Sequence, residues 1–128
     1  MIYIDSSVAL ARLLFESRAP SATFWQEQLV SSRLLEYEVW NRVHAYALIG
    51  SHGQLTNALL MGIELLEMDR RVLARALKPW PVAIRTLDGL HLATVDHLRS
   101  QGGSLELASY DNRLIAAARA IGVPIAAL

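Results

Sequence analysis

Short apolar strands alternating with helices are the feature that most restricts the fold of this 128-residue chain. Ile2–Ile4 is rich in β-formers and reads as a buried strand, and SVALARLLF (7–15) follows it as a helix. Residues 105–110 indicate a second strand, 112–121 a helix and 123–126 a last strand. Strands that are separated by helices pair in parallel through crossover connections. The pattern predicts an α/β fold, an α/β/α sandwich with a short-stranded, mainly parallel central sheet.

The middle of the chain is predicted to be mainly helical, with helices over 20–29, 33–48, 54–63, 69–77 and 86–100. A brief strand is predicted at 29–30, and Ser31 or Ser32 is a suitable N-cap for the helix that follows. Gly50 and Gly53 are predicted to bracket the stop between two of these helices. Asp69 is a plausible cap for the helix that reaches Leu77.

Composition limits the class of protein. Hydrophobic residues make up 53% and charged residues 19%, so one compact domain over residues 1–128 is expected. There is no cysteine, which excludes disulfides, thiol nucleophiles and cysteine zinc sites. No apolar run reaches the roughly 20 residues that a membrane span needs, and MIYIDSS does not resemble a signal peptide. A soluble, cytoplasmic protein is therefore expected, and its net charge of zero provides no general attraction for nucleic acid.

Four acidic residues stand at positions that the predicted fold brings together. Asp5 ends the first strand and Asp111 follows the strand at 105–110, so both belong to the carboxyl edge of a parallel sheet. Asp88 lies in the first turn of its helix, and Glu38 lies beside the apolar stripe of another. Neighbouring carboxylates repel each other unless a positive group separates them. Mg²⁺ or Mn²⁺ suits such an oxygen-rich site.

Each of these acids also has a purely structural interpretation. Aspartate is a preferred helix cap, and Asp5, Asp88 and Asp111 all stand at or just inside predicted helix starts. Glu38 precedes Arg42 by four residues, which is the favourable order for a surface ion pair on a helix. Spacing alone leaves both interpretations open.

Four segments, in order and over nearly the whole chain, resemble the PIN-domain ribonucleases and in particular the VapC-type toxins of toxin–antitoxin pairs. They are YIDSSVAL, SSRLLEYEVWNRVHAYA, IRTLDGLHLATVDHL and LASYDNRLIAAARAIGV. The four acids of that family fall on Asp5, Glu38, Asp88 and Asp111. Its small hydroxyl residues fall on Ser7 and Ser109.

The resemblance implies a Mg²⁺- or Mn²⁺-dependent endoribonuclease that cleaves RNA phosphodiesters and acts as the toxin of a type II pair. Asp5, Asp88 and Asp111 would hold the metal, and Glu38 would bind it directly or through water. Ser7 and Ser109 would be hydrogen-bond partners of these ligands. A cognate antitoxin, a toxin homodimer and an RNA substrate are implied as partners, with no membrane.

Other functions fit the sequence less well. The only lysine, Lys78, is misplaced for a phosphotransfer receiver. Ser6 and Ser7 stand where a two-aspartate phosphatase needs its second aspartate. The main alternative is a catalytically silent PIN-like binding module, although all four acids are retained.

Several further residues have two open interpretations. His91, three residues after Asp88, is expected to pack or to hydrogen bond rather than to act directly. Three arginines near the acids either contact substrate phosphates or neutralise the carboxylates; they are Arg42, Arg85 and Arg113. Apolar surface on residues 7–15, 20–29 and 54–66 could be covered by a partner helix.

Overall fold

A computed structural model describes residues 1–128 and contains a four-stranded, all-parallel sheet with the strand order β3-β2-β1-β4. The strands are β1 (Ile2–Ile4), β2 (Leu29–Ser32), β3 (Glu64–Leu66) and β4 (Glu106–Ala108). β1 lies in the interior of the sheet, where Ile2 is in register with Leu29 of β2 and with Glu106 of β4. The predicted parallel α/β fold is confirmed.

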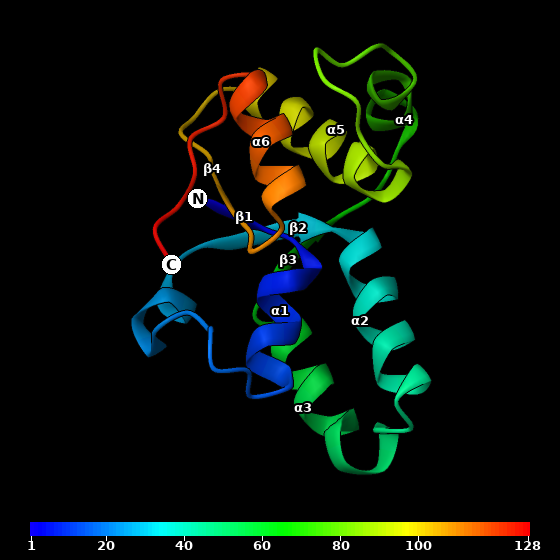
Figure 1. Cartoon of the computed structure of the whole chain (residues 1–128), viewed down its shortest axis with the longest axis vertical. Helices are drawn as coiled ribbons and strands as arrows, with labels where there is room; N and C mark the ends of the chain where they lie inside the picture. Colours follow the sequence, from blue (N-terminus) through cyan, green and yellow to red (C-terminus); the bar gives the residue numbers. More distant parts are fainter.

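Six α-helices cover the two faces of this sheet (Figure 1). They are α1 (Ser6–Leu13), α2 (Arg33–Ala45), α3 (Ile49–Met61), α4 (Arg70–Ala76), α5 (Thr86–Ser100) and α6 (Asn112–Ala120). Helices α1, α2 and α3 lie on one side, and α4, α5 and α6 lie on the other. Each layer buries its own hydrophobic cluster against the sheet, as a sandwich requires. No helix in the structure is both long and apolar enough to cross a bilayer.

Side-chain alternation along β1 links the central strand to both layers. Ile4 belongs to the cluster beneath α1–α3, whereas Tyr3 belongs to the cluster beneath α5 and α6. Both side chains are fully buried. Because successive residues of a strand point to opposite faces, Tyr3 faces α5 although its neighbours in sequence face α1.

Three local predictions were wrong. The segment 20–29 forms only a short 3-10 helix, Ala22–Gln26, because Phe24 is the only buried residue of that helix and a longer helix would lack an apolar face. Gly50 and Gly53 do not stop a helix but lie inside α3, and the chain turns earlier, at Ala47, whose φ is 53°. The expected last strand is reduced to a single bridge between Leu107 and Ile125.

The strand order places a crevice at the end of β1. The chain moves from β1 to β2 and β3 on one side and later places β4 on the other side of β1. In parallel sheets such a reversal opens a binding crevice beyond the carboxyl ends of the strands. Asp5 directly follows β1, and the segment from Ser109 to Asp111 directly follows β4. These residues therefore meet at the reversal.

Candidate functional site

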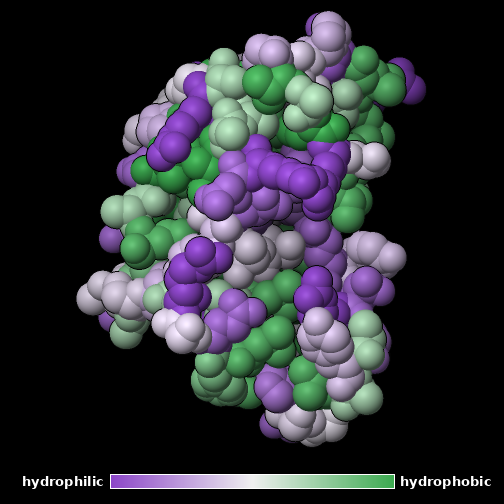
Figure 2. Space-filling view, in the orientation of Figure 1, coloured by the Kyte–Doolittle hydropathy of each residue, from purple (hydrophilic) through white to green (hydrophobic).

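A cavity of about 550 Å³ lies at this edge, and Asp5, Glu38, Asp88 and Asp111 all line it. The four acids come from the end of β1, from α2, from the first turn of α5 and from the start of α6. Figure 2 shows hydrophilic residues in a band across the middle of one face, between hydrophobic areas above and below. The structure thus brings all four predicted acids to one polar cavity.

Asp5 is the only acidic residue that is buried, with 4% of its surface exposed. Ser7 Oγ donates a hydrogen bond to Asp5 Oδ1 at 2.6 Å, and Ser109 Oγ donates to Oδ2 at 2.8 Å. Burial raises the pKa of Asp5, and these two hydroxyls act in the opposite direction. Although Asp5 occupies the N-cap position of α1, its side chain makes no capping hydrogen bond. Its carboxylate is directed into the site instead.

The two serines also join the ends of β1 and β4. Ser7 Oγ accepts a hydrogen bond from the Tyr110 amide, and Ser109 Oγ accepts one from the Asp111 amide, both at 2.9 Å. Each hydroxyl therefore donates to Asp5 and accepts from the segment after β4. This pairing fixes the Asp5 carboxylate relative to the chain that carries Asp111.

Glu38 is held by protein donors at both oxygens. His91 Nε2 lies 2.5 Å from Glu38 Oε1, and Ser6 Oγ donates to Oε2 at 3.2 Å. Arg42 does not pair with Glu38 but donates to the Tyr46 hydroxyl at 3.2 Å. The surface ion pair that the sequence offered as an alternative for Glu38 therefore does not form.

Asp88 and Asp111 differ in how their charge is stabilised. Burial, followed by repulsion from Asp111, raises the pKa of Asp88, which indicates that negative charge is concentrated here. Asp111 Oδ1 accepts hydrogen bonds from the amides of Arg113 at 2.9 Å and Leu114 at 3.4 Å. Asp111 therefore caps α6 and lines the cavity at the same time.

The donor chemistry of the cavity fits a hard divalent cation, because its acidic ligands are carboxylates supported by neutral hydroxyls. No three histidine, aspartate or glutamate side chains are grouped so that they could hold a metal ion together in this structure. Asp5, Glu38 and Asp111 are hydrogen bonded to other protein groups, and Asp111 repels Asp88. Repulsion keeps carboxylates apart when no cation lies between them. The acids surround one cavity without forming a closed metal cluster.

The arginines that line the cavity form no ion pairs with these acids. Arg18, Arg42 and Arg85 line the cavity, yet none forms a salt bridge. The guanidinium of Arg18 stacks on the ring of Tyr110, 4.5 Å from its centroid. Arg113 lies with Arg85 along an adjoining cavity of about 450 Å³ and is also unpaired. The structure thus does not use Arg42, Arg85 or Arg113 to neutralise the acids through ion pairs.

Sequence reasoning missed three residues that contribute to this site: Ser6, Tyr3 and Arg18. Arg18 lines the cavity, and no local pattern distinguishes it from the other arginines. Ser6 supports Glu38, and the only local signal is a hydroxyl residue between Asp5 and Ser7 at a helix start. Tyr3 contacts His91 Nδ1 at 2.7 Å, and the two-residue period of β1 could have placed its ring toward a helix on the opposite face. His91 was expected to pack or to hydrogen bond, and it does both.

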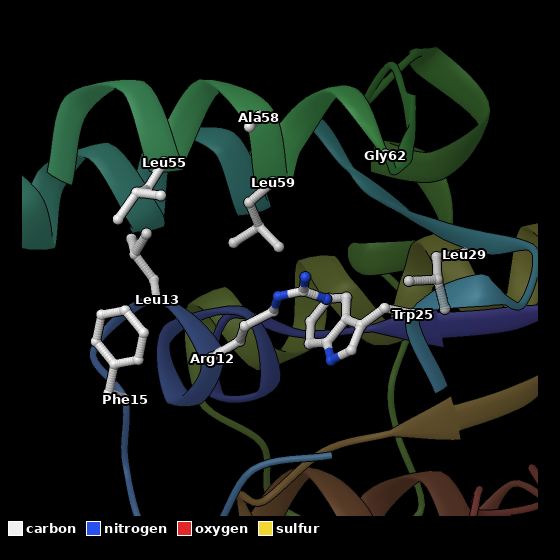
Figure 3. Close-up of a pocket in the computed structure, with 9 residues that line it drawn as sticks. All are labelled: Arg12, Leu13, Phe15, Trp25, Leu29, Leu55, Ala58, Leu59 and Gly62. Atoms are coloured by element: carbon white, nitrogen blue, oxygen red, sulfur yellow. The ribbon is translucent and has the colours of Figure 1, made fainter. Parts of the chain in front are cut away.

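A second, apolar cavity of about 380 Å³ lies away from the acids, between α1, the 3-10 helix and α3 (Figure 3). Its lining comes entirely from the three segments in which the sequence predicted uncovered apolar surface. Phe15 remains 77% exposed at its border. Arg12 lies over the ring of Trp25, 4.5 Å from its centroid, and provides one charged group in an otherwise hydrophobic wall.

Known proteins share both the sequence pattern and the fold. The family model described as "PIN domain" matches residues 2–120. Ribonuclease VapC46 of Mycobacterium tuberculosis (strain ATCC 25618 / H37Rv) is 32% identical over 98% of this chain and 96% of its own length. Ribonuclease VapC47 of Mycobacterium tuberculosis (strain CDC 1551 / Oshkosh) is 28% identical, with 95% and 93% covered. A chain in a toxin–antitoxin complex from Klebsiella pneumoniae has the same fold, with a TM-score of 0.68, 19% identity and 91% of both chains covered.

Proposed function

The chain belongs to the PIN-domain family, and on that premise we propose that it is a Mg²⁺- or Mn²⁺-dependent endoribonuclease and the toxin of a type II toxin–antitoxin pair. The observation that carries this proposal is the cavity itself. Four carboxylates from four separate segments line it, and the buried one, Asp5, is held at both oxygens by serine hydroxyls. A helix cap alone needs neither burial nor two hydroxyl donors.

The residues of the cavity would have different roles in catalysis. Asp5, Asp88 and Asp111 would hold the cation, with Glu38 as a further ligand. When bound, the cation would stabilise negative charge on phosphate oxygens, and it would lower the pKa of water so that hydroxide is available to attack at neutral pH. Ser7 and Ser109 would keep Asp5 ionised and in place through their hydrogen bonds.

The unpaired arginines suit the substrate that this function needs. Guanidinium groups bind phosphate oxygens through two parallel hydrogen bonds. Arg18, Arg42 and Arg85 line the acidic cavity, and Arg113 lines the adjoining cavity together with Arg85. We assign them to RNA phosphates on either side of the bond that is cut.

The apolar cavity supports the proposed protein partner. A helix with an apolar face could fill the space between α1 and α3, where Leu13 and Leu59 both face the cavity. A cognate antitoxin is our candidate for this surface, with a homodimer as the proposed state of the toxin. A monomer without affinity for a helical partner in sizing experiments would contradict both proposals.

The direct test is cleavage of total cellular RNA by the purified protein in Mg²⁺ or Mn²⁺, followed by mapping of the new ends. The matched control is Asp5→Asn, which keeps the shape of the side chain and removes its charge. We expect new ends with the wild type and none with the variant, while the circular dichroism of the two proteins stays the same. Equal metal-dependent cleavage by Asp5→Asn would refute the assignment.

A catalytically silent binding module is the second candidate, because no three side chains are already grouped as a metal site. Thermal melting separates the two functions. A cation that binds only the folded protein raises its melting temperature with increasing concentration. We expect such a rise with millimolar Mn²⁺ for the wild type and a smaller one for Asp5→Asn. No shift for either protein would favour the silent module.

A further inference from the structure

Tyr3, His91 and Glu38 form a row of hydrogen bonds that leads from the interior of the sheet to the acidic cavity. The Tyr3 hydroxyl lies 2.7 Å from His91 Nδ1, and His91 Nε2 lies 2.5 Å from Glu38 Oε1. The three residues come from β1, α5 and α2, so the row joins the central strand to both helical layers. Tyr3 is fully buried and His91 is 2% exposed, whereas the Glu38 side chain is 17% exposed at the cavity.

The donors and acceptors in this row are consistent with one arrangement of protons. An ionised carboxylate only accepts, so His91 Nε2 carries the hydrogen that points to Glu38. In the tautomer that carries its only hydrogen on Nε2, the Nδ1 atom accepts from the Tyr3 hydroxyl. Burial raises the pKa of Tyr3, which keeps its proton available for donation. The Tyr3 oxygen in turn accepts from the Ser32 amide at 3.2 Å.

Packing alone does not explain why two polar side chains, those of Tyr3 and His91, are buried here. His91 lies among the buried residues of α5, where a leucine would fill space without a buried polar group. With Oε1 held by His91 and Oε2 by Ser6, the Glu38 carboxylate is restrained at both oxygens. Hydrogen bonds of this kind orient metal ligands and strengthen the binding of the metal.

We propose that His91, oriented by Tyr3, is a positioning residue that holds the Glu38 carboxylate in place for the divalent cation. This inference rests on the proposed function, and it assigns to Tyr3 and His91 a role that neither the acids nor the serines provide. His91 acts through Glu38 and does not touch the substrate.

Isothermal titration of the metal-free protein with Mn²⁺ tests the role of His91. We expect His91→Leu to bind Mn²⁺ about 10- to 100-fold more weakly than the wild type, because the orienting donor is lost. His91→Gln should restore most of the affinity, since its amide can still donate to Glu38. His97→Leu is the matched control, because His97 is on the same helix but bonds only to Gln101. Wild-type affinity in a folded His91→Leu protein would overturn the proposal.

The ring tautomer provides a second measurement that needs no variant of His91. The ¹⁵N chemical shifts of the metal-free wild type should show a hydrogen on His91 Nε2, and Tyr3→Phe should show a mixture with the form that carries its hydrogen on Nδ1 alone. A wild-type ring that carries its hydrogen on Nδ1 alone would overturn the proposal, because Nε2 could then not donate to Glu38. A wild type that binds no Mn²⁺ would count against the proposed function as well, whereas tight binding unaffected by His91→Leu counts against this inference alone.

Discussion

The Asp5 carboxylate depends on two hydroxyl groups, because it is buried and neither of its oxygens has a cationic partner. Ser109→Ala removes one donor to Asp5 and the acceptor of the Asp111 amide. We expect the free energy of unfolding to fall by about 1.5–3 kcal/mol, the usual effect of losing a hydrogen bond to a buried charge. Urea unfolding at pH 7 with a chelator measures it.

A matched control is Ser100→Ala. Ser100 is an exposed serine whose hydroxyl donates only to a backbone carbonyl of its own helix. Its replacement should change the free energy of unfolding by less than about 0.5 kcal/mol. Equal stability of the two variants would show that Asp5 does not rely on Ser109.

The raised pKa of Asp5 makes a prediction about pH. A carboxyl group whose pKa is higher in the folded than in the unfolded protein favours folding below its ordinary value of 3.8. That contribution is lost as the pH rises through the folded pKa. Asparagine does not titrate, so the stability of Asp5→Asn relative to the wild type should increase from pH 4 to pH 7 in a chelator. Removing the Asp5 charge also removes one of the causes that raise the pKa of Asp88, and this effect acts in the same direction.

Unfolding of both proteins by urea across this pH range measures the effect. A difference in stability that stays constant with pH would mean that the pKa of Asp5 is not raised by burial. A difference that decreases with pH would mean that the folded protein stabilises the charged carboxylate more than water does.

Gly50 lowers the stability of α3, and nothing in the structure requires a glycine at this position. A methyl group added at Gly50 would meet no atom within 4 Å, and the residue is the second of α3, in its first turn. Gly50→Ala should raise the free energy of unfolding by up to about 0.5 kcal/mol, because alanine loses less backbone entropy on folding and the position lies in the first turn. Gly122→Ala should lower it by about 1–2 kcal/mol, since Gly122 has a φ of +77°. Chemical unfolding of both variants checks the pair, and a loss at Gly50 would contradict the expectation.

Elements with a strong local pattern could be predicted from the sequence, whereas those that depend on neighbours could not. β1 and α5 were placed correctly because their apolar spacing and flanking residues are local signals. β3 was missed because none of its residues is fully buried and because it is defined by its pairing with β2 at the edge of the sheet. α3 passes through two glycines because its packing outweighs their weak helix propensity.

The site shows the same division. Asp5 and Asp111 could be assigned to one edge because both follow strands of a parallel sheet. The contacts of His91 with Tyr3 and Glu38 join positions 88 and 53 residues apart, and no periodic pattern relates such distant residues. The acidic residues of the site could thus be identified from the sequence, but their hydrogen-bond partners could be identified only from the folded structure.

At the scale of the whole molecule, a net charge of zero must be reconciled with a polyanionic substrate. The acids that line the cavity, Glu16 included, outnumber the arginines that line it by five to three, so negative charge prevails there in the free protein. A bound divalent cation adds two positive charges at the point where the acids are concentrated. RNA binding should therefore depend on the cation, and we expect affinity to rise roughly tenfold or more when Mn²⁺ replaces a chelator.

Fluorescence anisotropy with a labelled phosphorothioate RNA, which resists cleavage, measures this dependence in the wild type and in Asp5→Asn. The variant should show a smaller effect of Mn²⁺ than the wild type, because one of the four carboxylates that line the cavity is neutral. Arg85→Ala should instead weaken binding with and without Mn²⁺, since an arginine that forms no ion pair acts on phosphate independently of the metal. If the wild type bound RNA equally well in a chelator, the arginines alone would account for binding, and the carboxylates would have to act only in the chemical step.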